Sequence, residues 1–370
     1  EVCMQTKAMV TRNQGEFSME QVTLHEPKAE EVLVRITAVG MCHTDLSVKD
    51  GFIPCPLPIV LGHEGAGVVE RVGSSVQGIE PGDHVVLSYS SCGRCDACLQ
   101  GKPAGCVHFA MLNFGGIMPD GTKRIEQSGQ EISTFFGQSS FSEYTVIHYR
   151  NVIKVPKDVP LEILAPLGCG ISAGSGAVLN KLQPEPGSSL AVFGCGAVGL
   201  SALMAAKVKG CTTIIAIDIN NDRLELAKEL GATHTINSTD VDNVVQKVTE
   251  ISNGGVKYAV ETSGVPQVLR QAVDSIKPLG TTAVVGAPPF GTNVELDHFG
   301  LISEKTIAGV TMGSSVPQLF IPELIELYKQ GLFPYDKLIT IYAFDEINQA
   351  AEDSKKGNTI KPVLRVSGLN

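Results

Sequence analysis

Four cysteines lie close together in this sequence, at positions 92, 95, 98 and 106. They occur in the segment Cys92-Gly-Arg-Cys95-Asp-Ala-Cys98, which is followed after seven further residues by Cys106. Four thiolates at this spacing can complete a tetrahedral shell around one Zn²⁺ and leave no coordination position open. The spacing therefore predicts a structural zinc site, with a disulfide-bonded loop as the alternative.

A second motif is the glycine-rich segment Gly194-Cys-Gly-Ala-Val-Gly199, which follows the apolar run Leu190–Phe193 and opens a predicted helix. Asp218 follows 19 residues after Gly199, at the end of the next predicted strand. This order is typical of dinucleotide binding, because the glycines let the backbone and a helix N-terminus approach the pyrophosphate. A carboxylate at Asp218 would accept hydrogen bonds from the adenosine ribose and repel a 2′-phosphate, which favours NAD over NADP. The alternative is a glycine-kinked core segment.

Three further residues could form a second metal site. His63 lies in Gly62-His63-Glu64 after a proline-rich stretch, and Cys42 and Cys169 are each flanked by glycine or other small residues. Two thiolates and one imidazole make the three-ligand shell of a catalytic zinc, which keeps a fourth position open. The sequence does not show that the three residues meet, and a lone histidine is more often structural than a ligand.

The elements that must position these residues change in type along the chain. After Pro186-Gly187, apolar strands alternate with helices, which argues for a doubly wound parallel sheet of six strands with helices on both faces. The predicted strands are Leu190–Phe193, Thr213–Ile217, Thr233–Ile236, Tyr258–Glu261, Thr282–Val285 and Thr306–Val310. The predicted helices between them are Val198–Lys209, Arg223–Leu230, Asp240–Ile251 and Gln267–Ile276.

The flanking parts of the chain have a different pattern. Roughly the first 160 residues contain short strand-like runs punctuated by glycine and proline, which predicts a β-rich region. Residues 92–140 are glycine-rich, and we expect an irregular lobe organised by metal. Beyond residue 310 we expect helices near Pro317–Gln330 and Phe344–Lys355 and a last strand at Lys361–Val366.

Composition excludes several classes of protein. The chain has 370 residues, 43% of them hydrophobic and 18% charged, so it can build a sizeable core. Its net charge of −10 argues against a nucleic-acid surface. The apolar stretch Ser188–Ala206 is interrupted by glycines, so we expect no membrane span. The N-terminal residues lack the pattern of a signal peptide, and we expect a cytoplasmic protein with reduced cysteines.

Together these motifs resemble the zinc-dependent medium-chain alcohol dehydrogenase family over essentially the whole chain. Gly62-His63-Glu64-Gly-Ala-Gly67, with Gly73 and Val76, is similar to the family's zinc signature, and the four-cysteine lobe and the glycine motif follow in the family's order. The resemblance implies a β-rich GroES-like catalytic domain, residues 1–170 and 311–370, that carries the structural-zinc lobe. It implies a Rossmann dinucleotide-binding domain over residues 171–310.

The resemblance also implies an activity. Leu87–Cys98 and the later Leu112-Asn-Phe-Gly-Gly are similar to bacterial aryl-alcohol (benzyl-alcohol) dehydrogenases. The implied reaction is NAD-dependent oxidation of an aromatic primary alcohol to its aldehyde, by zinc alkoxide formation and hydride transfer. One alternative is a broad-specificity primary-alcohol or glutathione-linked formaldehyde dehydrogenase, and another is a non-catalytic structural relative. The physiological alcohol and the direction of reaction in the cell stay open.

The family's ligands map onto this chain residue by residue. The resemblance implies two Zn²⁺ per chain, a catalytic zinc on Cys42, His63 and Cys169 and a structural zinc on the four lobe cysteines. The residues that it places at NAD are His43, Gly194, Gly196, Ala197, Val198, Gly199, Asp218, Arg223, Val284, Val285, Ala287 and Lys361.

Further catalytic roles follow from the resemblance. Thr44 is the expected first acceptor in a proton path, Asp45 orients His63, and Glu64 lies behind the zinc. Some family members end the proton path in a histidine where this chain has Ser47, which cannot act as a base near neutral pH. We therefore expect that His43 or water completes the path, or that proton release is slower, and we favour His43.

Substrate and assembly are the remaining expectations. The partner molecule is a small alcohol or aldehyde, and we expect an apolar pocket lined by Phe52, Ile53, Tyr89 and residues near Phe141. The resemblance implies a homo-oligomer, either a tetramer or a dimer, that pairs through the last strand of the coenzyme sheet near Thr306–Gly313.

Overall fold

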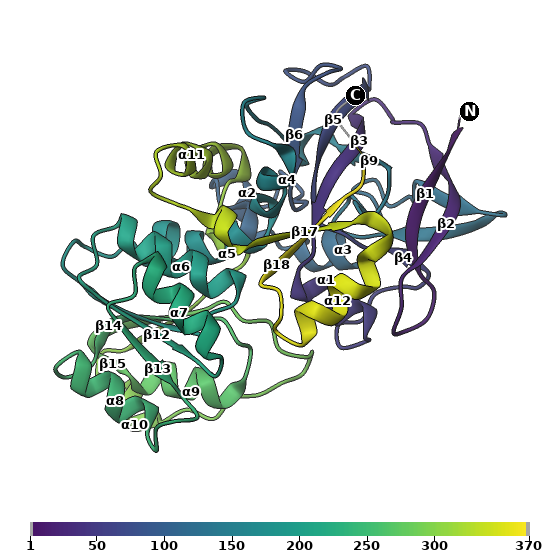
Figure 1. The fold of residues 1–370 in the computed structure, drawn as a ribbon. Coiled ribbons are helices and arrows are strands. Elements are labelled where there is room, and N and C mark those ends of the chain that lie inside the picture. The colour runs from purple at the N-terminus through teal and green to yellow at the C-terminus, as the bar shows by residue number, and fades with distance from the viewer. Residues whose placement is uncertain (1–2, 368–370) are drawn as a thin grey trace. The chain divides into compact units, whose positions relative to one another are not determined.

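The computed structural model describes residues 3–367, which divide into two compact units (Figure 1). The barrel unit contains the described residues up to Cys169, together with Val316–Ile325 and those from Asp336 onward. The parallel-sheet unit contains Gly170–Ser315 and Glu326–Tyr335. The chain therefore leaves the barrel unit twice and returns to it twice.

The parallel-sheet unit contains one sheet of six strands in the order β13-β12-β11-β14-β15-β16, all paired in parallel. The strands are β11 (Ser189–Phe193), β12 (Thr213–Asp218), β13 (His234–Asn237), β14 (Val256–Glu261), β15 (Ile276–Val284) and β16 (Thr306–Gly309). The helices between them are α6 (Ala197–Val208), α7 (Asn221–Leu230), α8 (Val244–Ile251) and α9 (Pro266–Asp274), with the short α10 (His298–Leu301) before β16. The order is that of a Rossmann sheet, so the predicted fold class is confirmed.

The core of this sheet explains its strong sequence pattern. Alternate residues of β11 and β12, such as Phe193 and Ile215, point to one face and pack with Val248 of α8 and Ala272 of α9. The residues between them are also buried, since β11 has four buried residues in succession. A parallel strand covered on both faces reads as a continuous apolar run, which is why these strands could be predicted.

One predicted helix start is displaced for a local reason. The sequence predicted a helix from Asp240, but α8 begins at Val244. The Asn243 side chain accepts a hydrogen bond of 3.0 Å from the backbone N–H of Gln246. This N-cap satisfies a free donor of the first helical turn and sets the start of the helix.

The barrel unit is rich in β-structure, as predicted. A closed barrel contains β1 (Cys3–Thr11), β2 (Ser18–His25), β7 (Ile125–Gln127), β8 (Gln130–Thr134) and β4 (Ile59–Val60). A second sheet has the order β10-β6-β5-β3-β18-β17, with β9 (Tyr144–His148) also paired to β3. Its other strands are β3 (Glu31–Gly40), β5 (Glu64–Val72), β6 (His84–Leu87), β10 (Val152–Lys154), β17 (Ile339–Ala343) and β18 (Lys361–Arg365).

The expectation that residues 92–140 are irregular is wrong in part. This region contains α2 (Asp96–Leu99), α3 (Phe109–Phe114) and the β7–β8 hairpin. The hairpin turns at Ser128 and Gly129, whose φ angles are +51° and +78°. Two successive residues with positive φ form the tight turn that matches the twist of a two-stranded hairpin.

The C-terminal segment completes the sheet of the barrel unit. β18 pairs antiparallel with β3, so that Val363 lies opposite Gly40. Helix α1 (His43–Lys49) follows β3 directly. Residues more than 300 positions apart in the sequence therefore lie side by side, and Lys361 is brought next to Met41 and Glu64.

Within residues 3–367 no single helix is long and apolar enough to cross a membrane. One bent pair, Leu161–Gly168 with Gly170–Leu182, is long and apolar enough only when its two members are taken together.

Candidate active site

The three predicted catalytic ligands meet in the barrel unit. The ligand atoms of Cys42, His63 and Cys169 all lie within 4.8 Å of one another. Cys42 is the N-cap of α1, and His63 directly precedes β5. Cys169 ends the helical turn Ala165–Gly168, and its Sγ lies 3.2 Å from Nε2 of His63. Three separate segments therefore deliver two sulfurs and one ring nitrogen to one point.

Asp45 connects two of these segments. Its Oδ1 lies 2.9 Å from Nδ1 of His63 and accepts a hydrogen bond from the backbone N–H of Gly62 at 3.0 Å. Its Oδ2 accepts from the backbone N–H of Cys42 at 3.0 Å. Asp45 and His63 are both fully buried. A carboxylate on Nδ1 leaves Nε2 free to face the sulfurs, which is the usual arrangement behind a metal-bound histidine.

The electrostatics of the cluster follow from its burial. Burial disfavours a charged imidazole, but Asp45 and the Cys42 sulfur outweigh burial and raise the pKa of His63 to about 10. The hydrogen bond between the two sulfurs holds the pKa of Cys42 well below its usual range and the pKa of Cys169 well above it. The site therefore stabilises negative charge on the Cys42 sulfur and disfavours it on Cys169.

The donor set fits Zn²⁺. Bonds of about 2.0–2.3 Å in a tetrahedral shell separate neighbouring donor atoms by roughly 3.3–3.8 Å. The observed 3.2 Å between His63 Nε2 and Cys169 Sγ is close to this range. Two cysteines and one histidine supply three ligands, so a fourth position would face the substrate.

Glu64 and Lys361 form a buried ion pair beside the cluster. Nζ of Lys361 lies 3.0 and 3.1 Å from the two carboxylate oxygens of Glu64 and donates to the carbonyl of Met41 at 2.9 Å. Burial disfavours the ammonium, but Glu64 outweighs it and raises the pKa of Lys361 above its usual value. Lys361 is 2% exposed, so its charge is compensated by Glu64 and not by solvent.

Helix α1 presents the predicted proton-path residues. Thr44 Oγ1 lies 3.8 Å from the Cys42 sulfur, and the exposed His43 is the first residue of the helix. Ser47 lies one turn further along and is half-buried. The hydroxyl of Thr44 is therefore adjacent to the ligand cluster, and His43 is the titratable side chain of this helix that reaches solvent.

Sequence reasoning missed an aromatic cluster around His63. The Phe136 ring stacks on the imidazole with centroids 4.5 Å apart, and Phe135 contacts it edge-on at 5.4 Å. Phe114 packs on both rings. Phe136 has a φ of +52°, which is uncommon for a bulky residue. The adjacent pair Phe135-Phe136 was a signal in the sequence, but only the fold placed it at His63.

The predicted substrate-lining residues lie in different surroundings. Phe52 is 56% exposed, whereas Phe141 is fully buried and its ring packs on Phe17 at 5.4 Å. Ile53 is half-buried. Tyr89 is buried against Phe109, with ring centroids 5.6 Å apart.

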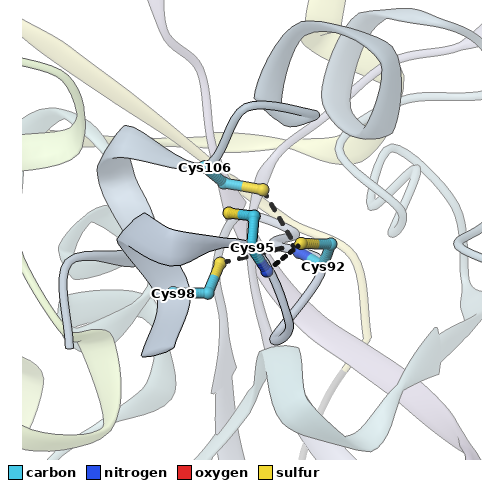
Figure 2. A group of neighbouring side chains, drawn as sticks. All are labelled: Cys92, Cys95, Cys98 and Cys106. Atoms are coloured by element: carbon cyan, nitrogen blue, oxygen red, sulfur yellow. Dashed lines mark hydrogen bonds between the residues drawn. The ribbon is translucent and has the colours of Figure 1, made fainter. Parts of the chain in front are cut away.

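The four lobe cysteines converge as the spacing predicted (Figure 2). Their sulfurs all lie within 4.8 Å of one another, and the Cys92 and Cys98 sulfurs are 3.9 Å apart. Cys92 Sγ accepts hydrogen bonds from the backbone N–H groups of Arg94 and Cys95 at 3.5 and 3.3 Å, and Cys106 Sγ accepts from Cys92 at 3.3 Å. The turns that carry the cysteines also stabilise their thiolates.

The thiols of the lobe are free, as a metal site requires. All ten cysteines are unbonded, so the structure has no disulfide-bonded loop here. A backbone hydrogen bond from Cys98 lowers the pKa of Cys95 to about 6, whereas burial raises that of Cys106 to about 12. Four free sulfurs within 4.8 Å of one another fit a closed tetrahedral zinc site.

The glycine motif forms the tight turn between β11 and α6. Gly194 has a φ of +99°, and a Cβ on Gly199 would lie 1.7 Å from the Gly194 carbonyl oxygen. A Cβ on Gly196 would meet nothing within 4 Å, so the backbone there borders open space. Asp218 Oδ2 accepts from the Cys195 N–H at 2.7 Å. The carboxylate and the turn are therefore adjacent, as the motif predicted.

The surroundings of this turn fit a dinucleotide. Among the described residues, Nε of Arg223 is one of seven buried side-chain polar atoms without a hydrogen-bond partner. Val284 ends β15 and Val285 follows it, both half-buried, and Ala287 is exposed. These residues share the carboxyl edge of the sheet with Asp218, where nucleotides bind in open parallel sheets. An orphaned guanidinium nitrogen and an open glycine turn are the features that a phosphate- and ribose-bearing ligand would satisfy.

Comparison with known families identifies the family. A model described as "Alcohol dehydrogenase GroES-like domain" matches residues 28–157, and one described as "Zinc-binding dehydrogenase" matches residues 197–330. The chain belongs to the zinc-dependent medium-chain alcohol dehydrogenases. The expected family and the enzyme class, a zinc-dependent alcohol dehydrogenase, are thereby confirmed.

Similar proteins and solved structures agree with this assignment. The dehydrogenase is 45% identical over 353 residues to a geraniol dehydrogenase of Castellaniella defragrans, with 95% of this chain and 94% of the relative covered. It is 50% identical to a crystal structure of benzyl alcohol dehydrogenase from Acinetobacter calcoaceticus, with a TM-score of 0.95 and coverage of 98% and 100%. A zinc-binding dehydrogenase from Sinorhizobium meliloti 1021, bound to NADP, is 25% identical, with a TM-score of 0.81 and coverage of 98% and 100%.

Proposed function

We propose that this alcohol dehydrogenase oxidises primary alcohols whose hydroxyl-bearing carbon adjoins an unsaturated carbon, with benzyl alcohol as the type substrate and NAD as the oxidant. The proposal includes a catalytic zinc on Cys42, His63 and Cys169 and a structural zinc on the four lobe cysteines. The observation that carries it is the convergence of the three catalytic ligands, with His63 oriented by Asp45.

The residues of the chain divide the work of the reaction. Zinc, when bound, supplies a Lewis acid that lowers the pKa of a hydroxyl group, and NAD accepts the hydride. Asp45 holds the His63 ring in one tautomer. The buried Glu64 carboxylate beside the cluster is neutralised by its ion pair with Lys361. The hydroxyl of Thr44, 3.8 Å from Cys42 Sγ, is placed to accept the alcohol proton, and His43 would pass it to solvent.

The aromatic preference rests on the surroundings of His63 and on the relatives. The buried rings of Phe135 and Phe136 contact the imidazole, so the surroundings of the ligand cluster are apolar and aromatic. Benzyl alcohol and geraniol, the alcohols named for two relatives, both carry the hydroxyl on a carbon beside a double bond or aromatic ring. Conjugation of the product aldehyde is the chemical property that these two alcohols share.

The preference for NAD rests on Asp218. Its carboxylate lies beside the glycine turn. One oxygen accepts a hydrogen bond from the Cys195 N–H, and the other accepts one from the Asn220 N–H at 2.8 Å. A fixed negative charge at this position disfavours the 2′-phosphate of NADP.

The test is a panel of kcat/KM values. Benzyl alcohol, geraniol, 1-hexanol and S-hydroxymethylglutathione would be compared with NAD and with NADP, together with zinc content per chain. We expect two zincs, NAD preference and higher kcat/KM for the two unsaturated alcohols. Higher values for 1-hexanol or the glutathione adduct would support the broad or formaldehyde-linked alternatives instead. A zinc-loaded protein that oxidises none of the alcohols would support the non-catalytic alternative.

Assembly and location form a separate part of the proposal. We propose a homotetramer, with a dimer as the alternative, in which subunits pair along β16, because β16 is an edge strand of its sheet. The segments before it expose large apolar side chains, Leu279, Phe290, Phe299 and Ile302. A monomeric mass by light scattering would contradict this. A cytoplasmic location is proposed because two thiolate metal sites require reduced cysteines.

A further inference from the structure

We propose that Gln138 is a positioning residue that holds the His63 and Cys169 segments in the geometry that binds the catalytic metal. Neither the family motifs nor the proposed mechanism uses this residue. The inference rests on the proposed catalytic metal site, and it concerns how the chain builds that site in advance of the metal.

Gln138 is fully buried, and its amide contacts the backbone on both sides of Glu64. Nε2 donates to the carbonyl of His63 at 3.1 Å, and Oε1 accepts from the N–H of Gly65 at 3.2 Å. Because a carbonyl needs a donor and an N–H needs an acceptor, these contacts determine which end of the amide is which. The two bonds restrain the backbone from which His63 points to the sulfurs and Glu64 points to Lys361.

The same amide reaches the third ligand segment through Ser88. Nε2 of Gln138 also donates to the Ser88 carbonyl at 3.3 Å, and the Ser88 hydroxyl donates to the Gly168 carbonyl at 3.0 Å. Gly168 directly precedes Cys169. A Cβ on Gly168 would lie 2.4 Å from the Leu87 carbonyl oxygen, so glycine permits this close approach. Asp45 thus joins the Cys42 and His63 segments, and Gln138 with Ser88 joins the His63 and Cys169 segments.

The turn that carries Gln138 is itself held against the histidine segment. The backbone N–H groups of Ser140 and Phe141 donate to the carbonyls of Gly62 and Leu61 at 2.8 and 3.0 Å. The Ser140 hydroxyl donates to Oε1 of Gln138 at 2.7 Å, so each amide group has two partners. The turn also includes Phe136, whose ring stacks on His63. A fully satisfied buried network of this kind specifies one geometry.

The test replaces the buried amide by a carboxylate of the same shape. Gln138→Glu turns the donor that faces the carbonyls of His63 and Ser88 into an oxygen, and repulsion displaces both segments. The matched control is Asn113→Asp, because Asn113 is also buried and donates to two carbonyls, those of Ser90 and Phe109 at 3.0 and 2.9 Å. Asn113 contacts none of the three ligand segments through these bonds.

The readouts are metal retention and the visible absorption of Co²⁺ substituted at the catalytic site. We expect Gln138→Glu to lower catalytic-site metal affinity by ~10–100-fold, the range for loss of a residue that supports metal ligands, and to shift the Co²⁺ bands. Asn113→Asp should change neither readout, even if it lowers the midpoint of unfolding as much as Gln138→Glu does. Unchanged affinity and spectrum in Gln138→Glu would overturn the inference.

A second variant keeps the test decisive where Gln138→Glu fails to fold. Ser88→Ala removes only the hydroxyl that donates to Gly168, and it should lower the same metal affinity by a smaller factor. An unchanged affinity in Ser88→Ala would also count against the inference. The measurements need no substrate, so they are separate from the proposed activity. A parent enzyme that retains no metal on Cys42, His63 and Cys169 would instead contradict the proposed function.

Discussion

Nδ1 of His63 lies 2.9 Å from Oδ1 of Asp45, and both side chains are fully buried. The other oxygen of the same carboxylate accepts from the N–H of Cys42. One buried charge therefore orients two ligand segments, those of Cys42 and His63, which are 21 positions apart in the sequence.

Asp45→Asn should weaken the catalytic metal site without removing a ligand. The amide keeps the size of the carboxylate but loses its charge. Its single oxygen cannot accept all three hydrogen bonds that Asp45 now accepts from Cys42, Gly62 and His63. We expect a ~10–100-fold loss in metal affinity or kcat/KM. Zinc analysis after dialysis against a chelator, with steady-state kinetics, measures both. Full zinc content with parental kcat/KM would show that Asp45 does not orient His63.

Lys361→Met should destabilise the fold strongly. The change leaves the Glu64 carboxylate buried without its cation, and breaking one side of a buried pair costs about 3–5 kcal/mol. The matched control is Arg365→Met on the same strand, since Arg365 pairs with Glu162 at 2.9 Å and its side chain is 55% exposed. Loss of that surface pair should cost less than about 1 kcal/mol. Equal unfolding free energies for the two variants, from denaturant titration, would contradict the role of the buried pair.

Asp218→Gly should reduce the preference for NAD over NADP. The substitution removes the charge that repels a 2′-phosphate and also frees the Cys195 and Asn220 N–H groups. The ratio of kcat/KM with NAD to kcat/KM with NADP should fall by at least tenfold, which corresponds to about 1.4 kcal/mol. Asp222→Ala, at an exposed position in the first turn of α7, should leave the ratio unchanged. A parental ratio in Asp218→Gly would place the cofactor preference elsewhere.

The zinc affinity of the four-cysteine lobe should depend on pH more steeply below about pH 6. The pKa of Cys95 is lowered to about 6, so its thiolate is retained at neutral pH and is lost as the pH falls through that value. The Cys95 thiolate also contributes to the stability of the folded state. This contribution is fully present above the unfolded-state thiol pKa of about 8.5 and is lost as the pH falls through the folded-state pKa of about 6. The pKa of Cys106 is raised to about 12, so its proton is displaced by zinc throughout this range. Chelator competition between about pH 5 and pH 8 measures the slope, and a constant slope would refute the assignment of Cys95.

His43→Gln should lower turnover and change its pH dependence. His43 begins α1 next to Thr44, and its side chain is exposed, so it can exchange a proton with solvent. Histidine ordinarily titrates near pH 6.5, whereas glutamine does not titrate, so the limb of the pH–rate profile in that region should disappear. Ser47→Ala is the comparison, because serine carries no titratable group near neutral pH. An identical profile in His43→Gln would remove His43 from the proton path and leave water in its place.

Local patterns predicted whatever neighbouring residues could build by themselves. The four lobe cysteines lie within one short segment, so their convergence depends on two turns and a short helix. The glycine turn depends on the strand and helix that flank it, and Asp218 ends the adjacent parallel strand. Parallel strands buried on both faces leave an unmistakable apolar run. These features are decided by spacing, turn chemistry and burial, which the sequence carries directly.

The sequence by itself therefore determined the zinc lobe, the dinucleotide turn and the alternation that makes a Rossmann sheet. Only the tertiary structure decided that Cys169 meets His63 across 106 positions, that Lys361 pairs with Glu64 across 297, and that Phe136 and Gln138 both reach the histidine segment. The physical reason is that such contacts depend on how β3, β5 and β18 pair and on how buried polar groups find partners. Those choices are settled by packing of the whole unit, because no local periodicity specifies which distant carbonyl or sulfur a buried side chain will face.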